Sequence, residues 1–107
     1  MPDQPEAGEC PPPELPDGVL ARKLLISNKK GLHARASAKF VQTVERFDAD
    51  VTVTRCGETV GGRSIMGLLT LGAAQGTTIT VTAKGDDAEA CLGALTDLVT
   101  SRFGEDE

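Results

Sequence analysis

Apolar residues recur at helical spacing in the segment that follows His33. From Ala36 to Phe47 they are separated by four, one, three and three positions, with mostly polar residues between them. This spacing places apolar side chains on one stripe of an α-helix. We therefore predict an amphipathic helix that begins near His33 and buries five residues: Ala36, Phe40, Val41, Val44 and Phe47.

Four other segments have the composition or the alternation of β-strands. Residues 19–26 are mostly apolar, and residues 51–54 and 78–83 alternate apolar residues with threonine. Cys56-Gly57 can turn the second of these segments into a further strand that runs through Val60. β-Branched residues with a two-residue period favour strands that are buried on one face. We therefore predict four strands.

Two more helices are predicted in the second half of the chain. Ile65 to Leu71 is a short helical candidate, and Ser64 precedes it at the N-cap position. The last helix starts with Asp86, and Glu89 three residues later resembles a capping box. The apolar face of this closing helix contains Ala88, Cys91, Leu92, Leu95, Leu98, Val99 and Phe103.

The elements follow one another as β-α-β-β-α-β-α, which favours an α+β sandwich with helices on one face of an antiparallel sheet. The length of 107 residues suits one domain, which we assign to residues 18–104. Residues 1–17 contain all six prolines and are typical of a flexible acidic tail, and residues 105–107 form an acidic C-terminal end. We expect neither membrane insertion nor a secretory signal, because no apolar run approaches about 20 residues and the N-terminal segment lacks a basic and an apolar region.

The formal net charge of −5 is unevenly distributed along the chain. The first 17 residues contain five acidic and no basic residues, and the last three are all acidic. Residues 18–104 contain eight acidic and eleven basic residues, so the predicted domain is mildly basic. A basic surface suits acidic partner proteins and phosphate groups. We expect no nucleic-acid partner, because Trp and Tyr are absent and aromatic stacking platforms are scarce.

The three cysteines argue against several kinds of site. Cys10, Cys56 and Cys91 lie far apart and form no C-x-x-C pair, which argues against a zinc ribbon and a thioredoxin-like centre. Their odd number argues against a closed disulfide framework and favours a reduced, cytoplasmic protein. We expect neither a metal ion nor another cofactor.

His33 is the only histidine, and it lies between Gly31 and the first predicted helix. The first N–H groups of a helix lack intrahelical partners, so a phosphoryl group on the imidazole would find donors there. Arg35 can hold phosphoryl oxygens through two hydrogen bonds, and Gly31 lets the backbone approach closely. These features indicate a phosphohistidine site, and the simpler alternative is a surface cap residue. A hydrolase with His33 as general base is disfavoured, because the motif contains no carboxylate to orient the ring.

Ser64 is the second candidate site. Its hydroxyl can cap the short helix, which is worth about 1 kcal/mol and accounts for its presence without further function. A phosphate is tolerated electrostatically at this position, and Arg63 would offset its charge, so Ser64 is also a candidate regulatory phosphosite. The short helix has more apolar residues than one buried stripe needs, and those left exposed would form a docking surface, although all could instead belong to the core. These residues are Ile65, Met66, Leu68, Leu69 and Leu71.

Together the two motifs resemble the HPr family, the histidine-containing phosphocarriers of the bacterial phosphoenolpyruvate-dependent sugar phosphotransferase system. The resemblance runs from about residue 19 to 103, and it rests on Gly31-Leu32-His33-Ala34-Arg35 and Arg63-Ser64-Ile65-Met66-Gly67-Leu68 at the family's interval. It implies an open-faced β-sandwich, in which three helices cover one face of a four-stranded antiparallel sheet. We expect a monomer.

The resemblance also implies a role for each matching residue. His33 would accept a phosphoryl group on Nδ1 from phospho-enzyme I, as pros-phosphohistidine, and donate it to IIA proteins, with Arg35 as the active-site arginine. Ser64 would be modified by HPr kinase/phosphorylase. The phosphate- and partner-binding positions would be Gly31, Ala34, Arg63, Ile65, Met66 and Leu69. The chain would then be a relay component more than an autonomous enzyme.

One position departs from the family pattern, since many members have proline after the arginine and this chain has Ala36. Alanine forms helices well, so the start of the helix should be preserved. Asn28-Lys29, the alanine-rich helix start and the acidic C-terminus resemble the nitrogen-related branch, which leaves the output open between sugar transport and nitrogen regulation. The alternative function is a regulatory binding module that acts mainly through phosphorylation of Ser64. Relatives of that kind have replaced the histidine, whereas this chain retains His33.

Overall fold

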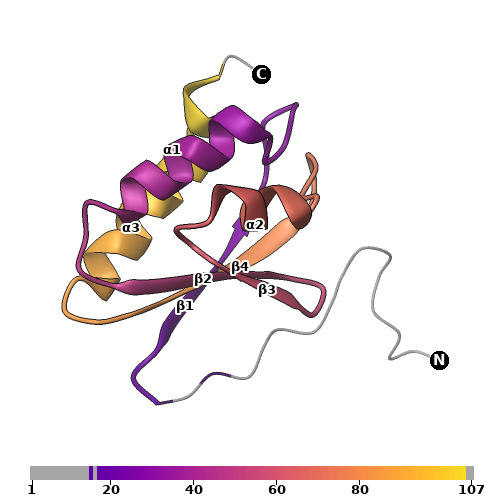
Figure 1. Ribbon diagram of the computed structural model, residues 1–107. Coiled ribbons are helices and arrows are strands. Elements are labelled where there is room, and N and C mark those ends of the chain that lie inside the picture. The colour runs from indigo at the N-terminus through magenta and orange to yellow at the C-terminus, as the bar shows by residue number, and fades with distance from the viewer. Residues whose placement is uncertain (1–14, 16, 106–107) are drawn as a thin grey trace.

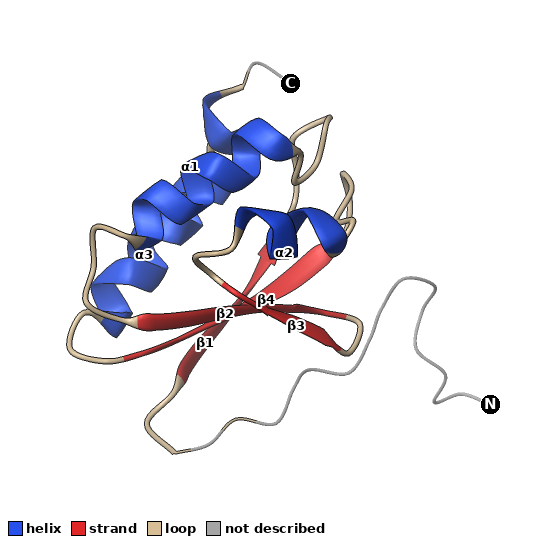
Figure 2. Cartoon of the chain, viewed as in Figure 1, coloured by secondary structure: helices blue, strands red, loops and turns tan. Residues whose placement is uncertain are grey.

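The structure is a computed structural model that describes residue 15 and residues 17–105. Three helices lie over one face of a four-stranded sheet, and a short 3₁₀ turn follows the last helix (Figures 1 and 2). The elements are β1 (Leu20–Leu25), α1 (Ala34–Val44), β2 (Asp50–Arg55), β3 (Glu58–Gly61), α2 (Ile65–Thr70), β4 (Thr78–Lys84), α3 (Ala88–Thr100) and η1 (Arg102–Gly104). The predicted element order and fold class are confirmed. Most of the predicted tail, residues 1–17, lies outside the described residues.

The sheet is antiparallel throughout, with the strand order β1-β4-β2-β3. Val53 of β2 pairs with Val60 of β3 on one side and with Val81 of β4 on the other. Val53 and Val81 have no exposed surface, because alternate residues of a strand point to the same face and this face is covered by the helices. The threonines that alternate with these valines along β2 and β4 point to the opposite face, which no helix covers (Figure 2).

The predicted apolar stripes of the long helices form the core, with differences at their ends. Phe40 and Val44 of α1 are fully buried, but the helix ends at Val44, and Phe47 packs partly buried against the core from the following loop. The closing helix ends at Thr100, so the prediction that Phe103 belongs to it is wrong. Phe103 lies in η1 with a φ of 57° and is nevertheless fully buried.

The first strand is more exposed than its apolar composition predicts. Within β1 only Leu24 is buried, whereas Leu20 is 44% and Leu25 is 56% exposed. Leu25 alternates with Leu24 and therefore points to the face that no helix covers, and Leu20 begins a strand at the edge of the sheet. Ile26, just beyond the strand, is fully buried and continues the core face of Leu24.

The hairpin between β2 and β3 has the predicted two-residue turn. Cys56 and Gly57 have φ values of 48° and 85°, as a type I′ turn requires. Cys56 is disulfide-bonded, so the expectation that the cysteines are all reduced is wrong at this position. Cys91 is a free thiol in the core of α3. Burial raises the pKa of the Cys91 thiol, an effect that Arg63 opposes and Asp87 reinforces.

The capping box predicted at Asp86 and Glu89 is not formed. Asp87 is the N-cap of α3, and its side chain makes no capping hydrogen bond to the helix. Its carboxylate instead accepts a hydrogen bond from the backbone N–H of Asp48 at 2.8 Å. This contact joins the start of α3 to the loop before β2, a connection that local spacing could not reveal. In the described part of the chain, no helix is long and apolar enough to cross a membrane.

Candidate functional site

The loop before α1 is fixed against a distant segment of the chain. Gly31 has a φ of +67°, and a Cβ at this position would lie 2.5 Å from the carbonyl oxygen of Ala73. The N–H of Leu32 donates to the same oxygen at 2.9 Å. Glycine is therefore required at position 31 both by its left-handed backbone and by the close approach of Ala73. This docking determines where the next residue, His33, enters the helix.

His33 is the N-cap residue of α1, in extended backbone conformation, and its side chain makes no capping hydrogen bond. The first hydrogen bond of the helix runs from the Ser37 N–H to the His33 carbonyl at 2.8 Å. Within the described residues the N–H groups of Ala34, Arg35 and Ala36 have no acceptor. A helix start with unpaired N–H groups is suited to bind an anion. The predicted position of His33 at the helix start is confirmed.

A carboxylate from the C-terminal end lies against the imidazole. Glu105 Oε2 is 2.5 Å from His33 Nε2, and the two residues are 72 positions apart in the sequence. Glu105 Oε1 accepts a hydrogen bond from Asn28 Nδ2 at 3.1 Å. The absence of an orienting carboxylate from the motif therefore does not mean that the folded site lacks one. The sequence motif contains no such residue, because the fold supplies it from the opposite end of the domain.

Asn28 connects this carboxylate to the loop. Its side chain has no exposed surface, and the same Nδ2 also donates to the Gly31 carbonyl at 2.8 Å. Asn28 Oδ1 is buried and has no partner within the part of the chain that is described. The amide thus joins the loop and Glu105, the carboxylate in contact with His33.

The contacts of Glu105 favour its charged form. Burial raises the pKa of its carboxyl group, but hydrogen bonds from His33 and Asn28 and the nearby charges of His33 and Lys30 outweigh that effect. The net result is a pKa below the ordinary value of 4.5. The side chain is 17% exposed and that of His33 is 27% exposed. The ring is therefore accessible on part of its surface while Nε2 faces an ionised carboxylate.

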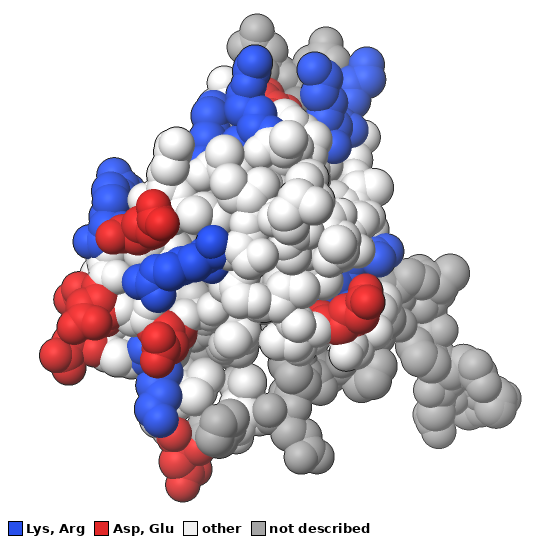
Figure 3. Space-filling model, in the orientation of Figure 1, with Lys and Arg blue, Asp and Glu red and all other residues white. Residues whose placement is uncertain are grey.

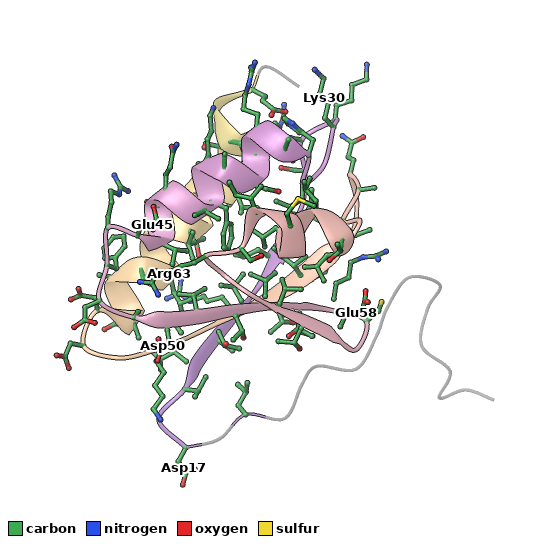
Figure 4. All side chains as sticks on the ribbon, viewed as in Figure 1. Asp17, Lys30, Glu45, Asp50, Glu58 and Arg63 are labelled. Carbon is green, nitrogen blue, oxygen red and sulfur yellow. The ribbon has the colours of Figure 1, made fainter. Side chains whose placement is uncertain are left out.

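Basic side chains gather around this end of the molecule. Figure 3 shows Lys and Arg side chains grouped where α1 begins, and Figure 4 labels Lys30 there. Arg35 is exposed in the first turn of α1, and no hydrogen bond or ion pair of its guanidinium occurs among the described residues. Arg35 thus lies in the exposed first turn that His33 begins, and its role in holding a phosphoryl group stays a prediction.

Arg63 has a different environment. Its guanidinium donates to the carbonyl oxygens of Ala49, at 3.3 Å, and Phe47, at 3.4 Å. Figure 4 places it toward the end of α1 that is remote from Lys30. The structure therefore does not bring Arg63 to His33, and its observed contacts stabilise the loop between α1 and β2.

Ser64 is exposed and caps α2 as predicted. Its Oγ accepts a hydrogen bond from the Gly67 N–H at 2.9 Å. This is the usual N-cap geometry, in which the side chain supplies the acceptor that the helix backbone lacks. The hydroxyl is therefore both structurally used and open to solvent.

The apolar residues of α2 and its C-cap, Leu71, divide between the core and the surface, as their number predicts. Leu68 and Leu71 are buried, whereas Ile65 is 39% and Met66 is 70% exposed. Leu69 is half-buried. We call Ile65, Met66 and Leu69 the α2 patch, an apolar surface next to Ser64.

The site offers few alternatives for its chemistry. Over residues 17–105, no group of three or more His, Cys, Asp and Glu is arranged to hold a metal ion. His33 contacts Glu105 but makes no hydrogen bond to a hydroxyl or thiol in this range. A base-activated Ser, Thr or Cys nucleophile is therefore not assembled around the ring. The nucleophile that the site itself presents is the imidazole.

Comparison with known proteins agrees with this geometry. The family model described as the PTS HPr component phosphorylation site matches residues 20–101. The chain is 48% identical over 89 residues to the phosphocarrier protein HPr of Neisseria meningitidis serogroup B, which covers 83% of this chain and 100% of the relative. It is 42% identical over 86 residues to the phosphocarrier protein NPr of Shewanella violacea, covering 80% and 94%. The crystal structure of HPr-C-His from Thermoanaerobacter tengcongensis superposes with a TM-score of 0.79 and 42% identity, covering 82% of this chain and 99% of that one.

Proposed function

Because the chain belongs to the HPr family, we propose that it is a phosphocarrier that accepts a phosphoryl group on His33 from phospho-enzyme I and donates it to IIA proteins. The observation that carries this proposal is the position of His33, partly exposed at the start of α1 with unpaired N–H groups beside it. The protein would act in the cytoplasm, as a relay between two partners.

The helix start supplies what a phosphohistidine requires. The N–H groups of Ala34 and Arg35 are available for hydrogen bonds to phosphoryl oxygens, and the positive end of the helix dipole favours the added charge. The exposed guanidinium of Arg35 can hold two of these oxygens at once. These groups would stabilise the phosphorylated form without enclosing it, so that the group remains transferable.

The surface around the site suits acidic protein partners. The basic side chains near the start of α1 would attract an acidic surface, and the α2 patch would supply apolar contact area. Complementary charge mainly accelerates association, which suits a carrier that exchanges partners at each cycle. Relatives named HPr and NPr are comparably similar, so the downstream acceptor is either of the sugar or of the nitrogen-related kind.

Phosphorylation with labelled phosphoenolpyruvate and enzyme I tests this function. We expect label that is lost in acid and stable in base, because a phosphohistidine is a phosphoramidate. His33→Ala should take up no label, whereas Ser64→Ala, the matched control at the other helix start, should be labelled as the wild type is. Label that persists in His33→Ala would refute the assignment.

We further propose that phosphorylation of Ser64 by an HPr kinase/phosphorylase regulates this transfer. Ser64 is exposed beside the α2 patch, and a phosphate there would place negative charge on the surface that we assign to acidic partners. Ser64→Asp should therefore slow phosphorylation of His33 by enzyme I, while Ser64→Asn, which adds no charge, should not. Equal rates for Ser64→Asp and the wild type would contradict this regulation.

A second candidate function is a regulatory binding module that acts mainly through phosphorylated Ser64. The exposure of Met66 next to Ser64 favours this function, because an apolar surface at Ser64 could bind a partner without any phosphoryl transfer through His33. This function predicts acid-stable label from ATP and a kinase, lost in Ser64→Ala. It would replace the first if His33→Ala left every cellular output unchanged.

A further inference from the structure

The C-terminal end of the described chain is held in place rather than extended into solvent. Arg102 and Phe103 have φ values of 59° and 57°, which turn the backbone sharply after α3. Phe103 is fully buried, and its carbonyl accepts a hydrogen bond from Lys39 Nζ of α1 at 2.6 Å. Residues with bulky side chains adopt positive φ only where surrounding contacts enforce it. These contacts direct Glu105 toward the start of α1 (Figure 1).

Both oxygens of the Glu105 carboxylate have partners. Oε2 faces His33 Nε2 at 2.5 Å, and Oε1 accepts from the buried Asn28 at 3.1 Å. The carboxylate is thus fixed in orientation by one side chain of the loop while it contacts another. This arrangement joins two segments that are more than 70 positions apart in the sequence, so it depends on the complete fold.

We propose that Glu105 is a positioning residue for phosphoryl transfer, which holds the proton of the neutral His33 imidazole on Nε2 and leaves Nδ1 as the nucleophile. The inference rests on the proposed phosphocarrier function. An ionised carboxylate only accepts hydrogen bonds, so the ring nitrogen that faces it must be the donor. In a neutral imidazole the other nitrogen then carries the free lone pair. Nδ1 makes no hydrogen bond to any residue of the described ranges, so that lone pair is unblocked.

The transfer step is balanced without a further reactant. The lone pair of Nδ1 forms a bond to the phosphorus of the donor, and the bond from phosphorus to the donor's leaving atom breaks with its electron pair on that atom. The proton on Nε2 stays in place. The ring gains positive charge, which the adjacent carboxylate of Glu105 offsets. Donation to the acceptor is the reverse of this step, and the ring returns to its neutral form with the same tautomer.

The opposite role, a carboxylate that repels the incoming phosphoryl group, fits the geometry less well. Glu105 contacts the ring at Nε2, on the edge away from Nδ1, so its charge is not directed at the reacting nitrogen. The cationic group that faces Glu105 besides the titratable ring of His33 is Lys30, which offsets part of its negative charge. The carboxylate is therefore closer to the ring, where positive charge develops, than to the incoming phosphoryl group, so attraction to the ring outweighs repulsion of that group.

The test combines a tautomer measurement with a transfer rate. In protein with ¹⁵N-labelled histidine, at a pH where the ring is neutral, the wild type should show a protonated Nε2 and an unprotonated Nδ1. Glu105→Ala should shift the ring toward a mixture of tautomers and slow enzyme I-dependent phosphorylation about 10-fold, the lower end of the loss seen when a residue that orients a metal-bound histidine is removed. Glu105→Gln should lie between the two, because its amide oxygen still accepts but carries no charge. Glu58→Gln, at the β2–β3 hairpin and remote from the site, is the control and should match the wild type (Figure 4).

The outcomes separate this inference from the proposed function. If the wild type takes up no label from enzyme I, the phosphocarrier function fails, and the tautomer measurement still tests Glu105. If the wild type is labelled and Glu105→Ala keeps both its tautomer and its rate, the positioning role is refuted. A faster rate in Glu105→Ala would also refute it and would identify Glu105 as an inhibitory group.

Discussion

The two short motifs of this chain each place a residue at the start of a helix, but the two helix starts are built differently. Ser64 turns its hydroxyl back to the helix and accepts the Gly67 N–H at 2.9 Å. His33 makes no such bond and instead contacts Glu105, so the first N–H groups of α1 remain unpaired among the described residues. At one helix start the side chain caps one N–H group, that of Gly67, whereas at the other no side chain caps the first turn, which is left open to an external anion.

The source of support differs in the same way. The cap at Ser64 involves residues three positions apart. The conformation at His33 depends on Ala73 beneath Gly31 and on Glu105 and Asn28 beside the ring. A reactive residue that must present an unsatisfied helix end to a substrate needs such support from elsewhere in the fold. We therefore predict that the conformation at His33 is sensitive to substitutions at residues distant in the sequence, whereas the cap at Ser64 is sensitive only to its immediate neighbours.

Gly31→Ala should have the largest effect. It forces a left-handed backbone on alanine and places a Cβ 2.5 Å from the Ala73 carbonyl oxygen, so we expect a loss of about 3 kcal/mol in the free energy of unfolding. Gly57→Ala is the matched control, because Gly57 also has a positive φ, of +85°, but open space around it. It should cost about 1 kcal/mol. Equal losses in urea denaturation would show that the contact with Ala73 is unimportant.

Asn28→Ala should follow. It removes a buried donor to Gly31 and Glu105, and loss of a buried hydrogen-bonding group costs about 1–3 kcal/mol. Gln75→Ala serves as the control, since that exposed amide makes one bond, to the Ser27 carbonyl, and should change stability by less than about 0.5 kcal/mol. If Asn28→Ala and Gln75→Ala unfolded at the same urea concentration, the buried contacts of Asn28 would not support the site at His33, and the contrast with Ser64 would fail.

Ser64→Ala should reduce stability by about 1 kcal/mol, through loss of the cap alone. Ser64→Thr keeps a hydroxyl acceptor and should lose less. Thermal unfolding of the two variants measures the difference. A loss in Ser64→Ala well above 2 kcal/mol would mean that Ser64 has structural contacts beyond its own helix.

The pH dependence of stability should show the smallest effect. The folded-state pKa of Glu105 lies below the ordinary value of 4.5, so its contribution is fully present above that pH and is lost as the pH falls through the lowered value. The difference in unfolding free energy between the wild type and Glu105→Gln should be well under about 1 kcal/mol and should shrink below pH 4.5. A difference that grew on acidification would contradict the ionised contact with His33.

The sequence predicted the local features of this molecule and missed the distant ones. The stripe of α1, the cap at Ser64 and the turn at Cys56-Gly57 follow from spacing and residue type, because helix periodicity, capping and hairpin turns are decided within a few residues. The position of His33 at a helix start was predictable for the same reason.

The missed features all depend on tertiary contacts. Glu105 looked like part of an acidic end, but the buried anchor of Phe103 carries it to His33. Asp87, not Asp86, precedes α3, and its carboxylate binds the N–H of Asp48 rather than its own helix. The only available signal for Glu105 was an acidic residue that closely follows an aromatic core residue, and such a signal does not indicate which helix it will meet.

The most direct test of the central claim is to locate the phosphoryl group on the ring. After phosphorylation with phosphoenolpyruvate and enzyme I, two-bond ¹H–¹⁵N correlation spectra with ³¹P coupling identify the nitrogen that carries phosphorus. The account predicts one phosphohistidine, at His33, with phosphorus on Nδ1 and the proton on Nε2. Phosphorus on Nε2, or label on Ser64 with none on His33, would contradict it.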